Sequence, residues 1–264
     1  MRSLRSTIAN APTGPPAPAR GVCPSRPPGR SELPADAELD SIGGMNDDPG
    51  LFQTIYSTRA IRRFKPDAVP DEVLFQLFDA AIRASSGQNA QDWRWVIIRD
   101  QKLKAQMRDW AVEGWGRYSA RYGGDEEIAA LPRNQRLSLL SVRDLAAHLH
   151  EVPVIVAVFG MRGRHSTPGG STFPAVQNFQ LAARALGLGS SIFNLPMRDQ
   201  LYELLGAPET NQLYCLIPLG YPTDRQGPLN RKPVKAVVFD EKFAQPWAFA
   251  EAQPDAGWGD RWIG

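Results

Sequence analysis

Apolar residues recur at helical spacing in several stretches between residues 70 and 187. This periodicity predicts helices over 71–84, 103–116, 136–150 and 173–187. The first begins after Pro70 with acidic residues in its opening turn, an arrangement that suits a helix N-terminus. The last has the clearest apolar stripe and ends at Gly187, a residue type that commonly caps helices. We expect the second helix to end near Gly114 and Gly116, because glycine weakens helices.

Short runs of β-branched and aromatic residues predict strands over 93–98, 152–159 and 213–219, with 234–239 as a further candidate. The run 152–159 is almost entirely apolar, a pattern typical of a strand that is covered on both faces. Pro218 favours a strand end or an edge, because proline has no amide to donate. The polar loop 85–89 joins a helix to a strand, and we expect it to carry binding groups. The stretch 123–127 is expected to be an exposed loop.

Composition and charge exclude several classes of protein. The formal net charge of +2 creates no large field for nucleic acid, so we expect no nucleic-acid partner. No run approaches the roughly 18 apolar residues of a membrane span, so we expect no membrane partner. The two cysteines, Cys23 and Cys215, cannot form a disulfide framework, and the cytoplasm is the expected compartment. Cys215 lies in an apolar run and is expected to be a small core residue.

Both ends of the chain differ in composition from its middle. Residues 1–44 are rich in proline and arginine and have little apolar surface to bury, which predicts a disordered N-terminal extension. An organelle transit peptide would be an alternative, but the prolines would break its amphipathic helix. Met45 is a plausible alternative start, and it would begin a folded domain over 45–240. Three of the seven tryptophans fall in the final 18 residues, so we expect 241–264 to form an aromatic arm. Such an arm either contacts a partner chain or folds back on its own subunit.

A basic stretch, 57–66, precedes the first long predicted helix. Arg59 and Arg62 are three residues apart, so a helical turn would place both guanidinium groups on one side. Two such forks suit one phosphate group, because the paired N–H donors match phosphate oxygens. The alternative is a solvated basic turn, since runs of charge commonly face water.

Other chemistry finds little support in the sequence. His148 and His150 are two residues apart and do not share a helix face, and His165 has no ligand-type neighbours, so no metal site is expected. Ser190 and Ser191 lack the context of a nucleophile elbow, which gives hydrolase chemistry no basis. The glycines of 187–189 follow a helix, whereas a dinucleotide fingerprint follows a strand.

Four motifs in this order resemble the nitroreductase family of FMN-dependent oxidoreductases over residues 46–240. They are 58–64, with Ala60 where a serine is common; 85–93, with Ser85 and Asp92 in place of two prolines; 186–190; and 217–222 followed by 231–233. The resemblance implies an α+β fold in which a mixed, mainly antiparallel sheet is flanked by helices. It also implies a homodimer with FMN at the subunit interface.

The resemblance further implies which residues bind the cofactor. Arg59, Arg62 and Arg231 would hold the phosphate, Ser86 and Asn89 the polar edge of the isoalloxazine, and Ile192, Phe193 and Asn194 its face near N5. Ala60 and Gly87 lie in the same motifs and complete the predicted cofactor-binding set. No catalytic side chain is predicted, because the cofactor performs the chemistry.

The implied activity is transfer of hydride from NADH or NADPH, through flavin N5, to a small organic acceptor such as a quinone or nitroaromatic compound. A narrower biosynthetic or dehalogenating role within the same family is an alternative. A flavin-binding protein without turnover is a second alternative, from a different class.

Overall fold

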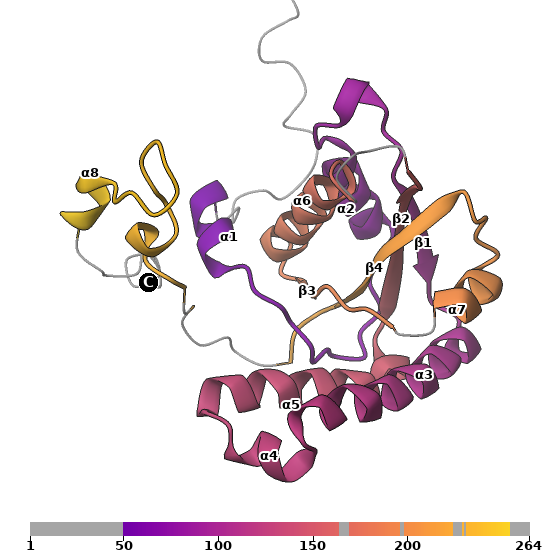
Figure 1. The fold of residues 1–264 in the computed structure, drawn as a ribbon. Coiled ribbons are helices and arrows are strands. Elements are labelled where there is room, and N and C mark those ends of the chain that lie inside the picture. The colour runs from indigo at the N-terminus through magenta and orange to yellow at the C-terminus, as the bar shows by residue number, and fades with distance from the viewer. Residues whose placement is uncertain (1–49, 164–168, 196–197, 224–228, 230, 254–264) are drawn as a thin grey trace, which may run out of the picture. The chain divides into compact units, whose positions relative to one another are not determined.

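A computed structural model describes residues 50–163, 169–195, 198–223, 229 and 231–253 (Figure 1). The predictions for residues 1–44, His165, Trp258 and Trp262 lie outside this part of the chain. The helices are α1 Leu51–Ser57, α2 Asp71–Ile82, α3 Gln101–Ser119, α4 Asp125–Ala130, α5 Arg133–Ala147, α6 Thr172–Ala185, α7 Arg198–Leu205 and α8 Ala248–Glu251. Short 3-10 turns occur at Gly87–Asn89, Ala120–Tyr122, Leu149–Glu151 and Val234–Ala236. The strands are β1 Arg94–Ile98, β2 Val154–Met161, β3 Gly189–Ser190 and β4 Asn211–Gly220.

The four strands form one sheet in the order β1-β2-β4-β3. Every pair of neighbouring strands is antiparallel. Val156 of β2 lies opposite Ile97 of β1 on one side and Ile217 of β4 on the other, so β2 is a central strand. An isolated parallel bridge between Ala60 and Ser190 gives the sheet its mixed character. The predicted α+β fold is therefore confirmed.

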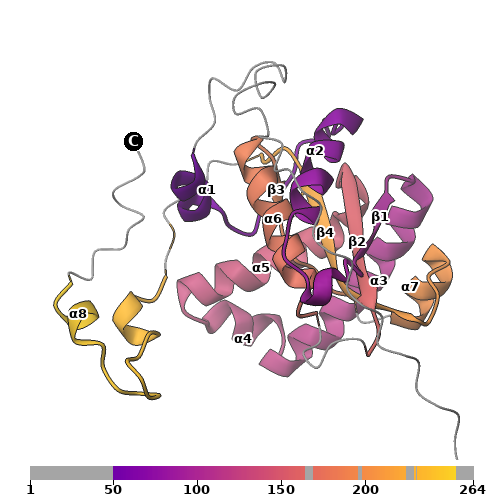
Figure 2. The ribbon, with the colours of Figure 1, turned by 90° about the horizontal axis from the view of Figure 1, so that it is seen from above.

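Helices cover both faces of the sheet, as Figures 1 and 2 show. Ile155, Ala157 and Phe159 of β2 pack in a cluster with residues of α3, α5 and α7. The intervening Val154, Val156 and Val158 pack on the other face with residues of α2 and α6. Alternate side chains of a strand point to opposite faces, so a strand between two layers must be apolar throughout. This explains the continuous apolar run, and the prediction of a doubly covered strand is confirmed.

Helix α6 ends as its sequence predicts. Gly187 has a φ angle of 76°, a left-handed conformation that glycine adopts at low cost. The Leu188 amide then donates to the Ala183 carbonyl at 2.7 Å, which satisfies one of the last carbonyls of the helix. The chain turns directly into β3, so the end of α6 and β3 are held beside each other.

Three local predictions are wrong. Helix α3 continues through Gly114 and Gly116 to Ser119, because Trp115 and other apolar residues of this helix pack against the core. This packing offsets the cost of about 1 kcal/mol that each glycine imposes on a helix. The stretch 123–127 is not simply a loop, since α4 begins at Asp125. The candidate strand 234–239 contains a 3-10 turn at Val234–Ala236 and an isolated antiparallel bridge from Phe239 to Pro246, and no described strand pairs with it.

Candidate functional site

The basic segment that follows α1 is extended and forms no helical turn. The Ile61 amide donates to the Ser190 carbonyl at 2.9 Å, and Phe64 forms a bridge with Pro222. Gly189 permits this pairing, because a Cβ atom at that position would lie 2.6 Å from Ile61 Cγ2. Side chains alternate along an extended chain, so residues three apart point to opposite sides. The expectation that the Arg59 and Arg62 guanidinium groups lie on the same side is therefore wrong. Each arginine lines a different cavity.

Arg59 lines a small cavity together with the end of α1, the end of α6 and β3. We call it the Arg59 cavity; it is lined by Ser57, Thr58, Arg59, Ile61, Gln180, Arg184, Leu188, Gly189, Ser190 and Pro222. None of these residues is acidic. The Arg184 Nε atom donates to Ser57 Oγ at 2.9 Å, which fixes the guanidinium group at the rim of the cavity.

Two arginines, Arg59 and Arg184, line the Arg59 cavity, and the charge of a third, Arg231, also acts on Arg59. Burial lowers the pKa of Arg59, and the positive charges of Arg184 and Arg231 lower it further. Like charges held together in this way repel one another unless an anion lies between them. The cavity therefore has the positive charge and, in Ser190, a hydroxyl donor that suit a phosphate group.

Arg62 lines a larger cavity of about 480 Å³ on the side of the segment that faces α3 and α5. We call it the Arg62 cavity; it is lined by Arg62, Ala111, Gly114, Trp115, Arg117, Tyr118, Arg121, Val142, Ala146, Ile192, Phe193, Asn194 and Leu195. The volume falls within the range of roughly 300–1,000 Å³ that is typical of small-molecule sites. Apolar walls with a few polar groups are also typical of such sites.

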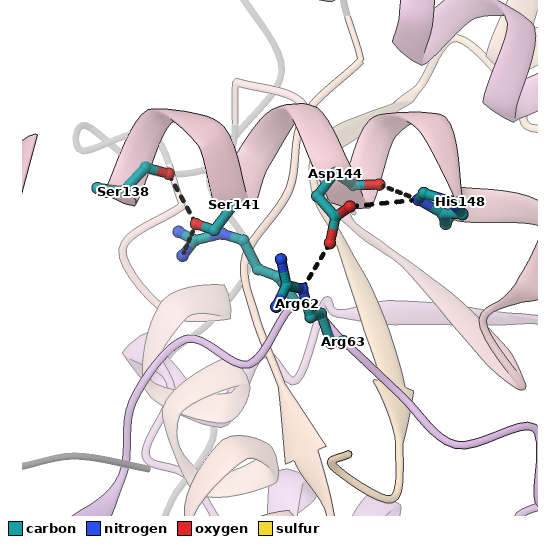
Figure 3. Close-up of polar contacts among 6 residues, drawn as sticks. All are labelled: Arg62, Arg63, Ser138, Ser141, Asp144 and His148. Atoms are coloured by element: carbon teal, nitrogen blue, oxygen red, sulfur yellow. Dashed lines mark hydrogen bonds and ion pairs between the residues drawn. The ribbon is translucent and has the colours of Figure 1, made fainter. Parts of the chain in front are cut away.

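Helix α5 holds Arg62 in place, as Figure 3 shows. Arg62 Nη1 donates to Ser141 Oγ at 3.2 Å, and Ser141 Oγ donates to the Ser138 carbonyl at 2.7 Å. The next residue, Arg63, forms an ion pair with Asp144 at 2.6 Å. Burial lowers the pKa of Arg62, but a guanidinium group remains protonated in proteins. Arg62 is thus a fixed, charged donor on the wall of the cavity.

The predicted binding residues Ser86, Gly87 and Asn89 lie elsewhere in the chain's fold. The Gly87 amide donates to Ser171 Oγ at 3.1 Å, so this loop is attached at the N-terminal end of α6. Arg184 lies at the opposite end of the same helix. The rise of an α-helix places Ser171 and Arg184 about 20 Å apart. One chain therefore does not bring this loop to the Arg59 cavity.

The structure brings together only some of the residues predicted from the sequence. Arg59 and Arg231 lie at one site, and Arg62 lines the other with Ile192–Asn194. The backbone of Ala60 is the bridge to β3 that separates the two sites.

Several lining residues were missed by the sequence reasoning. Arg184 lies in the last turn of α6, where a cation is ordinarily explained by the helix dipole, so it gave no distinct signal. The spacing of Arg117 and Arg121 could have indicated a shared basic wall, because residues four apart lie on one face of a helix.

The fold and the sequence both match known proteins. The Nitroreductase family matches residues 55–221, more than half of the chain, so the chain belongs to this family. An NADH dehydrogenase from Thermus thermophilus is 29% identical over 201 residues, which cover 68% of this chain and 90% of the relative. An iodotyrosine deiodinase from Thermotoga neapolitana is 28% identical over 174 residues, which cover 66% of this chain and 89% of the relative.

A solved structure extends the comparison to the fold. An oxidized iodotyrosine deiodinase bound to FMN and 3-iodo-L-tyrosine superposes with a TM-score of 0.59 at 26% identity. The match covers 72% of this chain and 98% of that chain.

Two further observations concern the described residues alone. No helix among them is both long and apolar enough to cross a membrane. They also contain no group of three or more His, Cys, Asp and Glu side chains that could hold a metal ion.

Proposed function

We propose that this chain is an FMN-dependent oxidoreductase that uses NADH or NADPH to reduce a small organic acceptor. The observation that carries the proposal is the pair of cavities on opposite sides of one extended segment. Three residues of extended chain, from Arg59 to Arg62, span about 10 Å. In FMN a ribityl chain of comparable length separates the phosphate from the isoalloxazine ring. One FMN molecule therefore fits with its phosphate at Arg59 and its ring at Arg62.

The Arg59 cavity would hold the phosphate through Arg59, Arg184 and Arg231. Their mutual repulsion, which lowers the pKa of Arg59, would be relieved by a bound dianion. Hydrogen bonds between guanidinium and phosphate are charge-assisted and about twice as strong as neutral ones. The hydroxyl group of Ser190, which also lines the cavity, supplies a further donor, whereas Thr58 Oγ1 already donates to the Thr54 carbonyl at 2.6 Å.

The Arg62 cavity would hold the ring system, which changes the role that the sequence motif gave to Arg62. Its guanidinium group, fixed by Ser141, would donate to the polar edge of the isoalloxazine. Ile192, Phe193 and Asn194 line the same cavity and would contact the ring. When bound, FMN supplies the two-electron transfer chemistry, and the protein binds and orients the reactants.

A second copy of the chain would complete the site. Ser86, Gly87 and Asn89 are held at the N-terminal end of α6, about 20 Å from Arg184, and none of them lines the Arg62 cavity, so we assign them to the flavin of a partner subunit. Large apolar side chains of α1 and of the C-terminal segment are exposed, including Phe52 at 61% and Phe243 at 91%. Exposed apolar side chains in such number are typical of surfaces that contact other proteins. We therefore include a homodimer in the proposal.

Reductive dehalogenation is the second candidate, because two of the proteins compared above are iodotyrosine deiodinases. Their named substrate is an amino acid, whose ammonium group would be favoured by a nearby carboxylate. No acidic residue is among the described residues that line the Arg62 cavity, and three arginines are. The described lining therefore offers no partner for the ammonium group, which favours acceptors that lack one.

The test begins with the absorbance spectrum of the purified protein and a titration of apoprotein with FMN. The proposal predicts a yellow protein that binds FMN in a ratio of one per chain. NADH or NADPH should bleach the bound flavin without oxygen, and a nitroaromatic or quinone acceptor should restore its colour. A protein that binds no flavin would contradict the proposal.

A further inference from the structure

The Arg62 cavity carries two arginines beyond the one assigned to the flavin. Arg117 lies in the last turn of α3, and Arg121 lies in the 3-10 turn Ala120–Tyr122 that follows it. Both line the cavity, and no acidic residue does so among the described residues. A cavity lined by cations and apolar groups selects for a ligand that combines a negative charge with an apolar body.

The two arginines differ in how far their charge is already compensated. Arg117 Nη1 lies 2.8 Å from Glu113 Oε1, so a carboxylate on the same helix pairs with it. Arg121 forms no ion pair with any described residue, and its neighbours on the cavity wall are aromatic. Arg121 is therefore the residue that keeps its charge available for an anion.

The aromatic residues beside Arg121 form a surface suited to a ring. The ring centroids of Trp115 and Tyr118 lie 5.8 Å apart, and those of Tyr118 and Tyr122 lie 5.4 Å apart. The hydroxyl groups of the two tyrosines lie 3.1 Å apart. This hydrogen bond raises the pKa of Tyr118 above its ordinary value. Aromatic side chains in such pairs stack well on other rings.

Resting on the flavin site described above, we propose that the acceptor of this enzyme is a nitroaromatic or quinoid ring that carries a carboxylate group, so that the nitro or quinone group takes up the electrons and the carboxylate serves for recognition. Its ring would lie against Trp115 and Tyr118, and its carboxylate would accept hydrogen bonds from Arg121. The paired N–H donors of a guanidinium group match the two oxygens of a carboxylate, which favours a carboxylate over an anion such as a phenolate that has one charged oxygen. Arg117 adds positive potential at the same wall and is partly neutralised by Glu113.

The test compares benzoate with benzamide, two ligands of nearly equal shape that differ in charge. Neither is reduced, so binding is measured without turnover, by isothermal titration calorimetry on the full-length protein with its flavin content recorded by absorbance. We expect benzoate to bind at least about tenfold more tightly than benzamide, because one charge-assisted hydrogen bond supplies that much selectivity. Arg121→Gln should remove most of this preference, and added salt should weaken benzoate binding alone.

Arg83→Gln provides the matched control. Arg83 is exposed and paired with Asp79 at 2.8 Å at the end of α2, on the opposite face of the sheet, so its loss should leave the preference unchanged. Glu113→Gln should strengthen benzoate binding, because it releases the charge of Arg117. Equal affinities for the two ligands in the unmodified protein would overturn the proposal, as would a preference that survives in Arg121→Gln. A protein that never takes up FMN would instead overturn the proposed function. The two failures are distinguishable, because calorimetry measures benzoate binding and absorbance measures the flavin content.

Discussion

Replacing Arg184 by alanine tests the phosphate site through a residue that the sequence motifs did not indicate. A charge-assisted hydrogen bond contributes about 1.5–3 kcal/mol where solvent is excluded. Arg184 is exposed, and its removal also relieves its repulsion of Arg59, so the net loss should fall just below this range. We expect a loss of about 1.4 kcal/mol, which is a tenfold rise in the Kd for FMN.

The assay titrates apoprotein into FMN and into riboflavin and follows the quenching of flavin fluorescence. Riboflavin lacks the phosphate, so Arg184→Ala should leave its Kd unchanged while raising the Kd for FMN. Arg184→Lys should fall between the two, because lysine keeps the charge and loses the planar fork. A variant that weakens FMN and riboflavin equally would refute the placement of the phosphate between Arg59 and Arg184.

Three further predictions follow from the contacts described above. Ser141→Ala should weaken riboflavin binding by about 1 kcal/mol, because Arg62 loses the hydroxyl that orients it; unchanged riboflavin affinity in the same fluorescence assay would count against a ring site at Arg62. Deleting residues 245–264 should weaken both dimerisation and flavin retention, because the described part of this segment exposes Trp247 and Phe249; sedimentation of a fully loaded dimer at low micromolar concentration would refute this. Burial raises the pKa of Cys215 from 9.0 to about 12, so unfolding should become easier above pH 9, where only the unfolded chain ionises this thiol. Urea titrations of the native protein and of Cys215→Ala at pH 8 and pH 10 measure this difference, and equal pH dependence in both would contradict it.

The periodic parts of the fold were predictable because their signals are local. The apolar stripe of α6, its glycine cap and the continuous apolar run of β2 each follow from residues that are close in sequence. The path of α3 through two glycines was not predictable in this way, because the compensating contacts come from packing against the core. The stretch 234–239 has strand-like residues, but no described strand lies beside it to form a ladder.

In the candidate site, too, the local motif was predictable, whereas the contacts between distant parts of the chain were not. The basic motif around Arg59 was recognisable, yet its conformation depends on Ser190, which lies far along the chain and accepts the hydrogen bond from Ile61. Without that pairing, a helical turn and an extended segment are equally compatible with the local residues. Arg184 joins the site for the same reason, since the fold places the end of α6 beside β3. The separation of the Gly87 loop from Arg59 became visible only through its attachment to Ser171.

The most direct test of the proposed function is an anaerobic titration of FMN-loaded protein with NADH and, separately, with NADPH. The visible absorbance of the flavin reports its reduction, and dithionite provides the reference for full bleaching. We predict complete bleaching by at least one of the two nucleotides at about one equivalent per flavin, and return of the colour when a nitroaromatic or quinone acceptor is added. A flavin that dithionite bleaches but neither nucleotide reduces would contradict the account and would indicate a flavin-binding protein without this activity.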